Sequence, residues 1–329
     1  MDNSKRENVK VQLLAVLVGI LLLLGKFLAY YLTNSNTILT DALESIINVV
    51  AGSFGLYSLI VAALPKDENH PYGHGKIEFI SAGVEGTLVT IAGLLIISKS
   101  IYNLFYPGPI QQIDIGIYIT AGAGLINYLL GAMVERKGHK SNSLAMIASG
   151  KHLKSDAYST IGLVVGLGVL YFTNYVWLDS VIAIIFGGII GWTGYHIVKE
   201  SVSGIMDEVD YKLVDHVVKI LNEHRHPHWI DVHNLRIIKY GADLHVDCHI
   251  TVPWYFNTVE AHAEVDRLED LLQSQIDVPV ELFIHVDPCI VESCSICQLT
   301  DCPKRQAPFE EIIEWELDNI MRNRKHQHD

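Results

Sequence analysis

Long apolar segments alternate with short polar breaks over the first part of the chain. Six of these segments are long enough to cross a bilayer core of about 30 Å. They cover residues 11–32, 38–63, 78–105, 113–135, 143–172 and 178–198. After Lys199 the apolar positions become sparse. The pattern predicts a polytopic α-helical membrane protein, with six transmembrane helices in residues 1–205 and a soluble part after them.

The charges that flank the breaks predict an orientation. The second and fourth breaks carry Lys and Arg, and the outer breaks carry none. The basic residues concerned are Lys66, Lys76, Arg136, Lys137 and Lys140. The positive-inside rule then places both termini in the cytoplasm, in a cell inner membrane. No small-residue cleavage site follows the first apolar segment, so we expect no cleavable signal peptide.

The pattern after Met206 is that of a small α+β domain. Helical periodicity covers Tyr211–His224, and a second helix runs from its cap at Thr258 to Gln275. Alternating positions predict strands, namely Val232–Tyr240, Asp243–Val252 and Pro279–Val286. The order is αββαβ, and we expect residues 206–288 to form an antiparallel sheet core. Residues 289–329 read as a Cys-rich tail with a helix over Phe309–Arg322.

Composition supports a membrane protein that handles cations. Half of the residues are hydrophobic, and mean hydropathy is +0.26. The formal charge of −13 comes mostly from the C-terminal part, which disfavours nucleic acid as a partner and is compatible with attracting cations. Eleven of the sixteen His residues follow Met206, which points weakly to metal.

His152 and Asp156 are four residues apart in the fifth apolar segment, so they share a helix face. In the second segment Asp41, Glu44 and Asn48 also share a face. Ionisable groups inside a membrane indicate function by default. Glu44, Asn48, His152 and Asp156 offer nitrogen and oxygen ligands that suit tetrahedral Zn²⁺ and also tolerate Fe²⁺, Mn²⁺ or Co²⁺.

Two structural interpretations compete with this metal site. The polar residues of the fifth segment could mark a helix end near the lipid headgroups. The acids could also form salt bridges inside the membrane with nearby lysines, namely Lys26, Lys99, Lys151 and Lys154.

The second break holds a compact group of metal ligands. It reads Asp67-Glu-Asn-His70-Pro-Tyr-Gly-His74-Gly-Lys76-Ile-Glu78. In a tight Gly/Pro loop, Asp67, His70 and His74 could gather on one ion. An ordinary polar loop is the alternative.

These motifs resemble those of the cation diffusion facilitator family, proton-coupled exporters of divalent metals. The loop Asp67–Glu78 looks like the motif between the family's second and third helices. Asp41-Ala-Leu-Glu44-Ser-Ile-Ile-Asn48 is similar to its second-helix motif, and His152-x-x-x-Asp156 matches its fifth-helix motif. The resemblance implies six transmembrane helices, a metallochaperone-like cytoplasmic domain and a homodimer.

One site departs from the family pattern. Zinc exporters of the family usually have His or Asp, and then Asp, where this chain has Glu44 and Asn48. An Asn binds metal through its carbonyl oxygen, but it cannot titrate. The sequence therefore does not fix the metal selectivity or the number of protons exchanged per ion. Asp41 is a candidate to support the ligands from the same helix face.

In the soluble domain the resemblance points to a second metal cluster. Its members are His233, His249, His262, His285 and Asp287. The residues themselves are compatible with this, because His245, Asp247 and His249 alternate on one strand face and Asp287 could bridge two ions. Surface histidines on an acidic domain are the alternative.

The tail carries four closely spaced cysteines, Cys289, Cys294, Cys297 and Cys302. Four thiolates could close a structural Zn²⁺ site. The alternatives are an iron–sulfur cluster, unliganded reduced thiols, or a Cys289 that joins the neighbouring His cluster.

The sequence thus predicts a divalent metal efflux transporter rather than an enzyme. We expect alternating access in a homodimer that exchanges a cation, Zn²⁺ first among the candidates, for protons across the bilayer. The first rival is a membrane-anchored metal sensor or metallochaperone with a degenerate transport site. The second is a redox membrane protein with a Cys-bound cluster.

Overall fold

The computed structural model describes residues 3–33, 36–106, 115–173 and 176–327. Within the helices some side chains, those of Asp41 and Glu44 among them, lie outside the described part. The chain divides into two compact units, Met1–Met206 and Asp207–Asp329. We call them the helical unit and the sheet unit.

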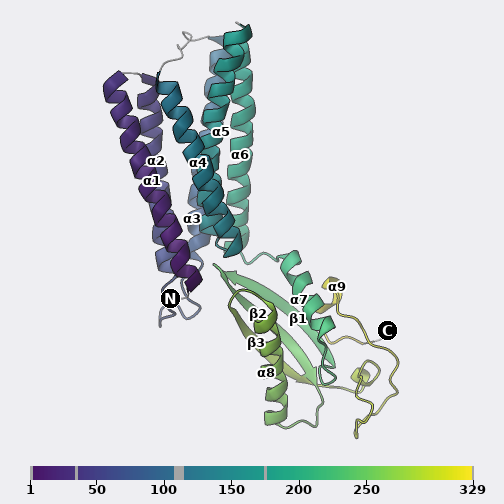
Figure 1. Ribbon diagram of the computed structural model, residues 1–329. Coiled ribbons are helices and arrows are strands. Elements are labelled where there is room, and N and C mark those ends of the chain that lie inside the picture. Colours follow the sequence, from purple (N-terminus) through teal and green to yellow (C-terminus); the bar gives the residue numbers. More distant parts are fainter. Residues whose placement is uncertain (1–2, 34–35, 107–114, 174–175, 328–329) are drawn as a thin grey trace. The chain divides into compact units, whose positions relative to one another are not determined.

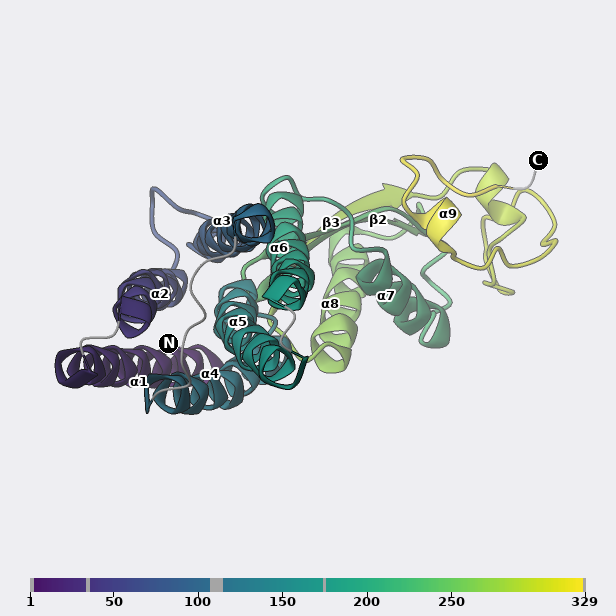
Figure 2. The same cartoon turned by 90° about the horizontal axis from the view of Figure 1, so that it is seen from above.

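The helical unit consists of long helices that run side by side (Figures 1 and 2). In the described residues these are α1 (Asn3–Thr33), α2 (Asn36–Ala62), α3 (Ile77–Phe105), α4 (Ile115–Lys140), α5 (Leu144–Thr173) and α6 (Val176–Ile205). They agree in number and position with the six predicted apolar segments. The most extensive helix contacts are between α3 and α6 and between α4 and α5.

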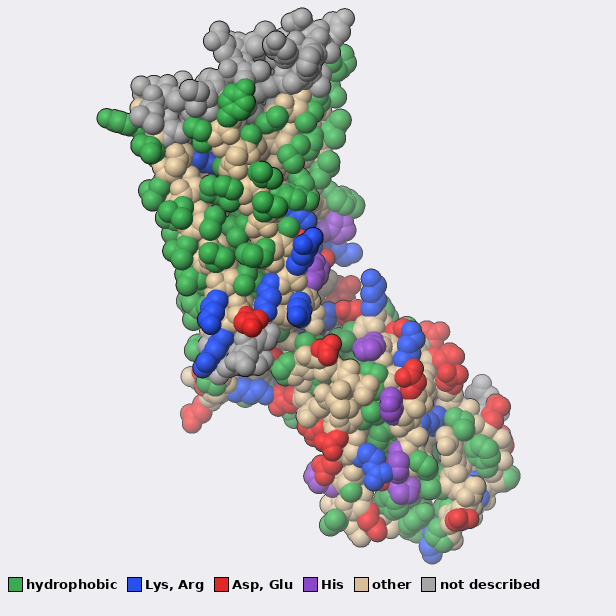
Figure 3. Space-filling model, in the orientation of Figure 1, with side chains coloured by type: hydrophobic (Ala, Val, Ile, Leu, Met, Phe, Trp, Pro, Cys, Tyr) green, Lys and Arg blue, Asp and Glu red, His purple; other side chains and the backbone are tan. Residues whose placement is uncertain are grey.

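The outer surface of the helical unit is apolar. Within the described residues, three stretches are long and apolar enough to cross a membrane, namely Lys5–Leu28, Ile77–Phe105 and Ser180–Ile205. On α1, Leu21 and Leu24 are 67% and 60% exposed, where a water-soluble bundle would carry polar residues. In Figure 3, hydrophobic side chains cover much of the visible face of the helical unit. Its basic side chains mostly lie towards the end that carries the N-terminus.

Glycine allows α3 and α6 to approach closely. A Cβ atom added to Gly93 would lie 2.5 Å from the backbone nitrogen of Gly191, and one added to Gly194 would lie 2.5 Å from that of Thr90. Small residues commonly serve this purpose between membrane helices.

The sheet unit has the predicted αββαβ order. Its elements are α7 (Tyr211–Glu223), β1 (Asp231–Tyr240), β2 (Asp243–Val252), α8 (Thr258–Gln275) and β3 (Val280–Pro288). The strands form one sheet in the order β1-β2-β3. β1 and β2 are antiparallel, joined at Gly241, whose φ of +64° suits glycine.

The expectation of an antiparallel sheet was wrong for its second half. β2 and β3 pair in parallel, with His249 opposite His285 and Thr251 opposite Asp287. The helix α8 between them carries the chain back to the edge where β2 began, as parallel pairs require. The predicted cap also differs, since Asn257 caps α8 by accepting the N–H groups of Val259 and Glu260.

The tail is part of the sheet unit rather than a separate body. Trp315 and Ile320 are buried in the same core as Leu221, Val246 and Leu268. The predicted helix over Phe309–Arg322 was wrong, because only α9 (Leu317–Ile320) is helical there.

Tertiary hydrogen bonds take the backbone groups that this longer helix would have used. The N–H of Glu310 donates to the carbonyl of Ser295 over 2.8 Å. Arg225 and Asn222 each donate to a tail carbonyl over 2.7 Å, those of Ile313 and Trp315 respectively. Arg225 also lies over the ring of Trp315, 4.0 Å from its centroid.

Candidate functional site

Three of the four predicted transport ligands meet inside the helical unit. The amide oxygen of Asn48 on α2 lies 3.2 Å from Nε2 of His152 on α5, and its amide nitrogen donates to Asp156 over 2.7 Å. Nε2 of His152 is 3.9 Å from the Asp156 carboxylate. Ligand atoms of a tetrahedral zinc ion are about 3.3 Å apart, so the spacing of Asn48 and His152 already suits an ion. The side chains of Glu44 and Asp41 lie outside the described residues.

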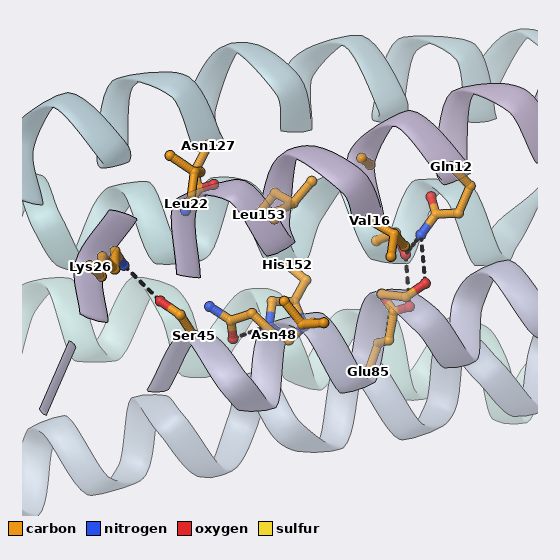
Figure 4. Close-up of a pocket in the computed structure, with 15 residues that line it drawn as sticks. Gln12, Val16, Leu22, Lys26, Ser45, Asn48, Glu85, Asn127, His152 and Leu153 are labelled. Carbon is orange, nitrogen blue, oxygen red and sulfur yellow. Dashed lines mark hydrogen bonds between the residues drawn. The ribbon is translucent and has the colours of Figure 1, made fainter. Parts of the chain in front are cut away.

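Two cavities border this site. One of about 40 Å³ is lined by Asn48 and His152 together with Gln12, Lys26 and Glu85, as Figure 4 shows. The other, of about 350 Å³, is lined by Asn48, His152 and Asp156 together with residues of α3 and Ile190 of α6. Asn48 and His152 therefore line both cavities.

The smaller cavity contains polar side chains that the sequence reasoning missed. Glu85 on α3 is 1% exposed, and one of its oxygens accepts from the hydroxyl of Ser149 over 2.7 Å. Gln12 donates to the same hydroxyl over 2.9 Å (Figure 4). Glu85 lies in the third apolar segment, seven residues after Glu78 on the same helix. An acidic residue within an apolar segment is itself a signal of function, and this signal could have identified Glu85 from the sequence.

In the described residues, three of the lysines proposed as salt-bridge partners also have contacts other than the transport acids. Lys154 lies 2.8 Å from Glu135, and Lys151 lies 3.4 Å from Glu200. Lys26 donates to the hydroxyl of Ser45 over 2.8 Å. Lys99 and Asp156 both line the larger cavity.

The loop ligands also come together. Asp67, His70 and His74 each offer a ligand atom, and these atoms all lie within 4.8 Å of one another. One Asp67 oxygen accepts the N–H groups of Asn69 and His70, which fixes the turn, while the other lies 3.5 Å from Nε2 of His74. Partial desolvation raises the pKa of Asp67, but its contacts with His70 and with the N–H of Asn69 outweigh that and lower it.

In the sheet unit a compact group forms from His233, His249 and Asp287, with ligand atoms within 4.8 Å of one another. One oxygen of Asp287 is 3.5 Å from Nε2 of His233 and 3.2 Å from Nδ1 of His249. Antiparallel pairing sets His233 opposite His249, and a register shift just after His233 breaks the ladder there.

A second layer that the sequence reasoning missed supports this group. Asp231 is 1% exposed and lies 3.0 Å from Nδ1 of His233, which leaves Nε2 facing Asp287. On the other side Asp231 contacts the imidazole of His326 from the tail. Burial raises the pKa of Asp231, yet His233 and His326 outweigh it and hold the pKa at about 2. A carboxylate behind a histidine is the usual support of a metal ligand.

Two predicted members stand apart from this group. The centroid of the His285 ring lies 4.6 Å from that of His249, with the rings tilted by 44°, and Nε2 of His285 is 3.6 Å from Asp287. It is therefore a neighbour of the group. His262 on α8 is 71% exposed and lies 3.7 Å from Asp266, so the structure does not bring it to the other ligands.

Another group, absent from the sequence predictions, consists of His226, His228 and Glu264. Glu264 is buried on α8 and accepts a hydrogen bond from the indole N–H of Trp229 over 3.0 Å. The two histidines lie 3.1 and 2.8 Å from its oxygens. With its acceptors already occupied, Glu264 ties α8 to the segment before β1.

All four tail cysteines are free thiols that line one cavity of about 250 Å³. Burial and the neighbouring thiols Cys294 and Cys302 raise the pKa of Cys289. In the described residues no three of these sulfurs lie within 4.8 Å of one another, unlike the ligand atoms of the histidine groups.

Comparisons with known proteins identify the domains that the two units represent. The profile of the cation efflux transmembrane domain matches residues 12–206. The profile of the cation efflux protein cytoplasmic domain matches residues 209–289. Together they cover both units up to the first tail cysteine.

Individual relatives are similar over most of their length. The transporter sll1263 of Synechocystis sp., described as uncharacterized, is 30% identical over 79% of this chain and 84% of its own. The manganese efflux system protein MneS of Bacillus subtilis is 26% identical over 83% and 91%. The cation-efflux pump FieF of Shewanella oneidensis is 24% identical over 84% and 93%. The chain is an integral membrane protein for metal cation efflux and belongs to the cation diffusion facilitator family.

Proposed function

We propose that the protein is a homodimeric antiporter that exports a divalent transition metal in exchange for protons. Zn²⁺ is the first candidate, and Fe²⁺, Mn²⁺ and Co²⁺ are the others. The ion binds Glu44, Asn48, His152 and Asp156. The protein resides in the cell inner membrane with both termini in the cytoplasm, as the basic residues around the second and fourth breaks suggest.

The convergence of Asn48, His152 and Asp156 carries this proposal. They come from two helices, and Asn48 and His152 line both neighbouring cavities. An ion held there reaches either space by a modest movement of the helices, which is what alternating access requires. Protons that bind His152 and the carboxylates weaken metal binding, because ligands must be deprotonated.

The outer ligand groups have separate roles in this proposal. Asp67, His70 and His74 hold an ion at the surface of the helical unit. In the sheet unit, His233, His249 and Asp287 bind metal as an effector, with His285 and His262 as the further candidates implied by the family. Metal there favours one state of the homodimer and so biases the transport equilibrium.

Flux into liposomes tests the transport site. Reconstituted protein with an imposed pH gradient is given Zn²⁺, Mn²⁺, Fe²⁺ or Co²⁺ in turn, and metal and proton movements are recorded together. We expect Asp156→Ala and His152→Ala to reduce flux at least about a hundredfold, since each removes a ligand. His196→Ala is the matched control, because His196 packs against Trp192 of its own helix, α6. Their ring centroids are 4.6 Å apart.

The sensor or metallochaperone alternative rests on Asn48, which spans His152 and Asp156 with a neutral amide. It predicts that wild type and Asp156→Ala move every tested metal at the same background rate. That result would rule out transport while leaving metal binding by the sheet unit intact.

A further inference from the structure

The tail of the sheet unit holds its shape with little regular structure. Between β3 and α9 the described residues contain only one short 3₁₀ turn, η1 (Glu292–Cys294). Even so, Ile230, Ile296 and Cys297 form a buried cluster there, with Leu299 and Ile313 packed against it. Long segments of this kind are uncommon in compact domains, and small bodies without a large core are often held by a metal or disulfides.

The tail cysteines surround a single space. Cys289 follows β3, Cys294 ends η1, Cys297 comes three residues later, and Cys302 lies in the next turn. All four border the cavity of about 250 Å³, and no disulfide joins them. The N–H of Cys289 donates to the carbonyl of Val252 over 2.9 Å, so the first thiol is anchored to the end of β2.

Hydrogen-bond donors are directed at three of the sulfurs. The N–H of Trp254 lies 3.4 Å from the sulfur of Cys289. The N–H of Leu299 bonds Cys297, two residues before it. The hydroxyl of Tyr255 bonds Cys302. Such donors are typical of the surroundings of metal-bound sulfur.

Arg305 fixes the turn that carries the central pair. Its guanidinium donates to the carbonyl oxygens of Cys294, Cys297 and Leu299 over 2.8, 2.9 and 2.7 Å. Lys304 also borders the cavity. A divalent ion with four thiolates has a net charge of −2, and these two cations offset it.

We propose that Cys289, Cys294, Cys297 and Cys302 bind one structural Zn²⁺ ion that fastens the tail to the sheet unit. The Cys-x₂-Cys pair at its centre has the spacing of zinc knuckles, and four thiolates close a tetrahedral site with no open position. Closing the site requires the side chains to rotate inward within the cavity, because the sulfurs do not yet converge.

The site acts on the tail beyond it. Downstream of the cysteines, the carbonyl of Arg322 accepts the N–H of Asn234 over 2.9 Å, and His326 contacts Asp231. Asp231 in turn lies against His233. Zinc in the tail therefore helps to hold His326 and Asp231 in place behind His233. Zinc binding by the tail does not itself require that the protein transports metal.

Metal content and cobalt spectroscopy of the purified full-length protein test this proposal. After dialysis against a weak chelator, we expect the double variant Cys294→Ser/Cys297→Ser to retain about one zinc per chain fewer than wild type. Cys248→Ala is the control, because Cys248 is a buried core thiol that does not line the cavity of the tail cysteines. Asp156→Ala separates this zinc from any ion at the transport site, and it should retain the tail zinc.

Cobalt keeps the test valid if the double variant does not fold. Wild-type protein whose zinc is replaced by Co²⁺ should show intense thiolate-to-cobalt charge-transfer absorption, and its tail thiols should be protected from a thiol reagent. Equal zinc in wild type and the double variant, or no such absorption in wild type, would overturn the proposal. Iron with acid-labile sulfide in the isolated protein would also overturn it, because the Cys-x₄-Cys-x₂-Cys run also occurs in [2Fe–2S] proteins.

Discussion

At the scale of single residues, Asn48 is the most informative position. Its amide presents oxygen to His152 and nitrogen to Asp156, so one side chain holds both ligands without adding charge. With Glu44 and Asp156 ionised and His152 neutral, the proposed site would carry two negative charges and balance one divalent ion. An aspartate at this position adds a third negative charge and a third titratable carboxylate.

Asn48→Asp should therefore bind metal more tightly and depend more steeply on pH. We expect about a tenfold lower metal concentration at half-maximal flux, a slower maximal rate, and a change in the order of preferred metals. Flux for each metal, measured over a range of pH beside wild type, checks this. Ser159→Ala, another residue that lines the larger cavity, is the control. Identical metal order and pH profiles would mean that Asn48 does not set selectivity.

Asp210 gives a pH dependence that can be assigned to one helix cap. It accepts the N–H groups of Lys212 and Leu213 at the start of α7. Partial burial raises its pKa, but Lys239 and the two N–H groups outweigh that and bring it below the ordinary 3.8. A carboxylate whose pKa is lower in the folded protein stabilises the fold when the pH is above its pKa in the unfolded chain. This contribution is lost as the pH falls through its pKa in the folded protein.

Asp210→Ala should cost the α7 region about 1 kcal/mol at neutral pH. Hydrogen exchange of the α7 amides in the full-length protein measures this difference, which should shrink below about pH 4. Asp210→Asn is the comparison, since it keeps a capping oxygen but loses the charge paired with Lys239. A loss in the Ala variant that is constant with pH would show that the charge plays no part.

At the scale of elements, the close contact of α3 with α6 depends on particular glycines. A Cβ atom on Gly194 would meet the backbone nitrogen of Thr90 at 2.5 Å and the carbonyl oxygen of Gly86 at 2.8 Å. Backbone atoms cannot rotate away, so the helices would have to separate. A Cβ atom on Gly188 of the same helix would meet no atom within 4 Å.

Gly194→Ala should destabilise the helical unit by about 1–3 kcal/mol, through overpacking. Gly188→Ala should be neutral or slightly stabilising, because alanine favours helix. The thermal unfolding midpoint of the purified protein in one detergent compares the two. If both variants unfold at the wild-type temperature, the α3–α6 contact is not as close in the membrane as in this structure.

The sequence predicted the elements well where periodicity determines them, and poorly where tertiary contacts do. The six apolar segments and the αββαβ order follow from hydropathy and alternation. The direction of β3 does not, because a strand's alternation is the same in a parallel or an antiparallel pair. The tail helix failed because Glu310, Ile313 and Trp315 make hydrogen bonds to distant residues.

The sites show the same division. Spacing along one helix or loop was enough to pair His152 with Asp156 and to gather Asp67, His70 and His74. Asp231 and His326 are 95 residues apart in sequence. No local pattern joins them, so the support of His233 could not be predicted. The resemblance named His262 as well, but in the described residues it lies alone with Asp266.

At the scale of the whole molecule, the proposal links ligand groups in both units through metal concentration. If metal at His233, His249 and Asp287 favours the transporting state, then weakening this group makes the transporter less sensitive to metal without damaging the transport site. Coupling between sites is typically about 1–3 kcal/mol, which corresponds to about 5- to 150-fold in apparent affinity.

His249→Ala should therefore raise the metal concentration at half-maximal flux at least about fivefold and leave the flux at saturating metal close to that of wild type. His216→Ala is the matched control, because His216 is an exposed histidine on α7 of the same unit. A transport-site variant behaves differently, since Asp156→Ala lowers flux at every concentration. Overlapping concentration curves for His249→Ala and wild type would show that the sheet unit does not regulate transport. A loss of maximal flux in His249→Ala would instead mean that this group is required for the folded dimer, which the elution volume of the purified protein would show directly.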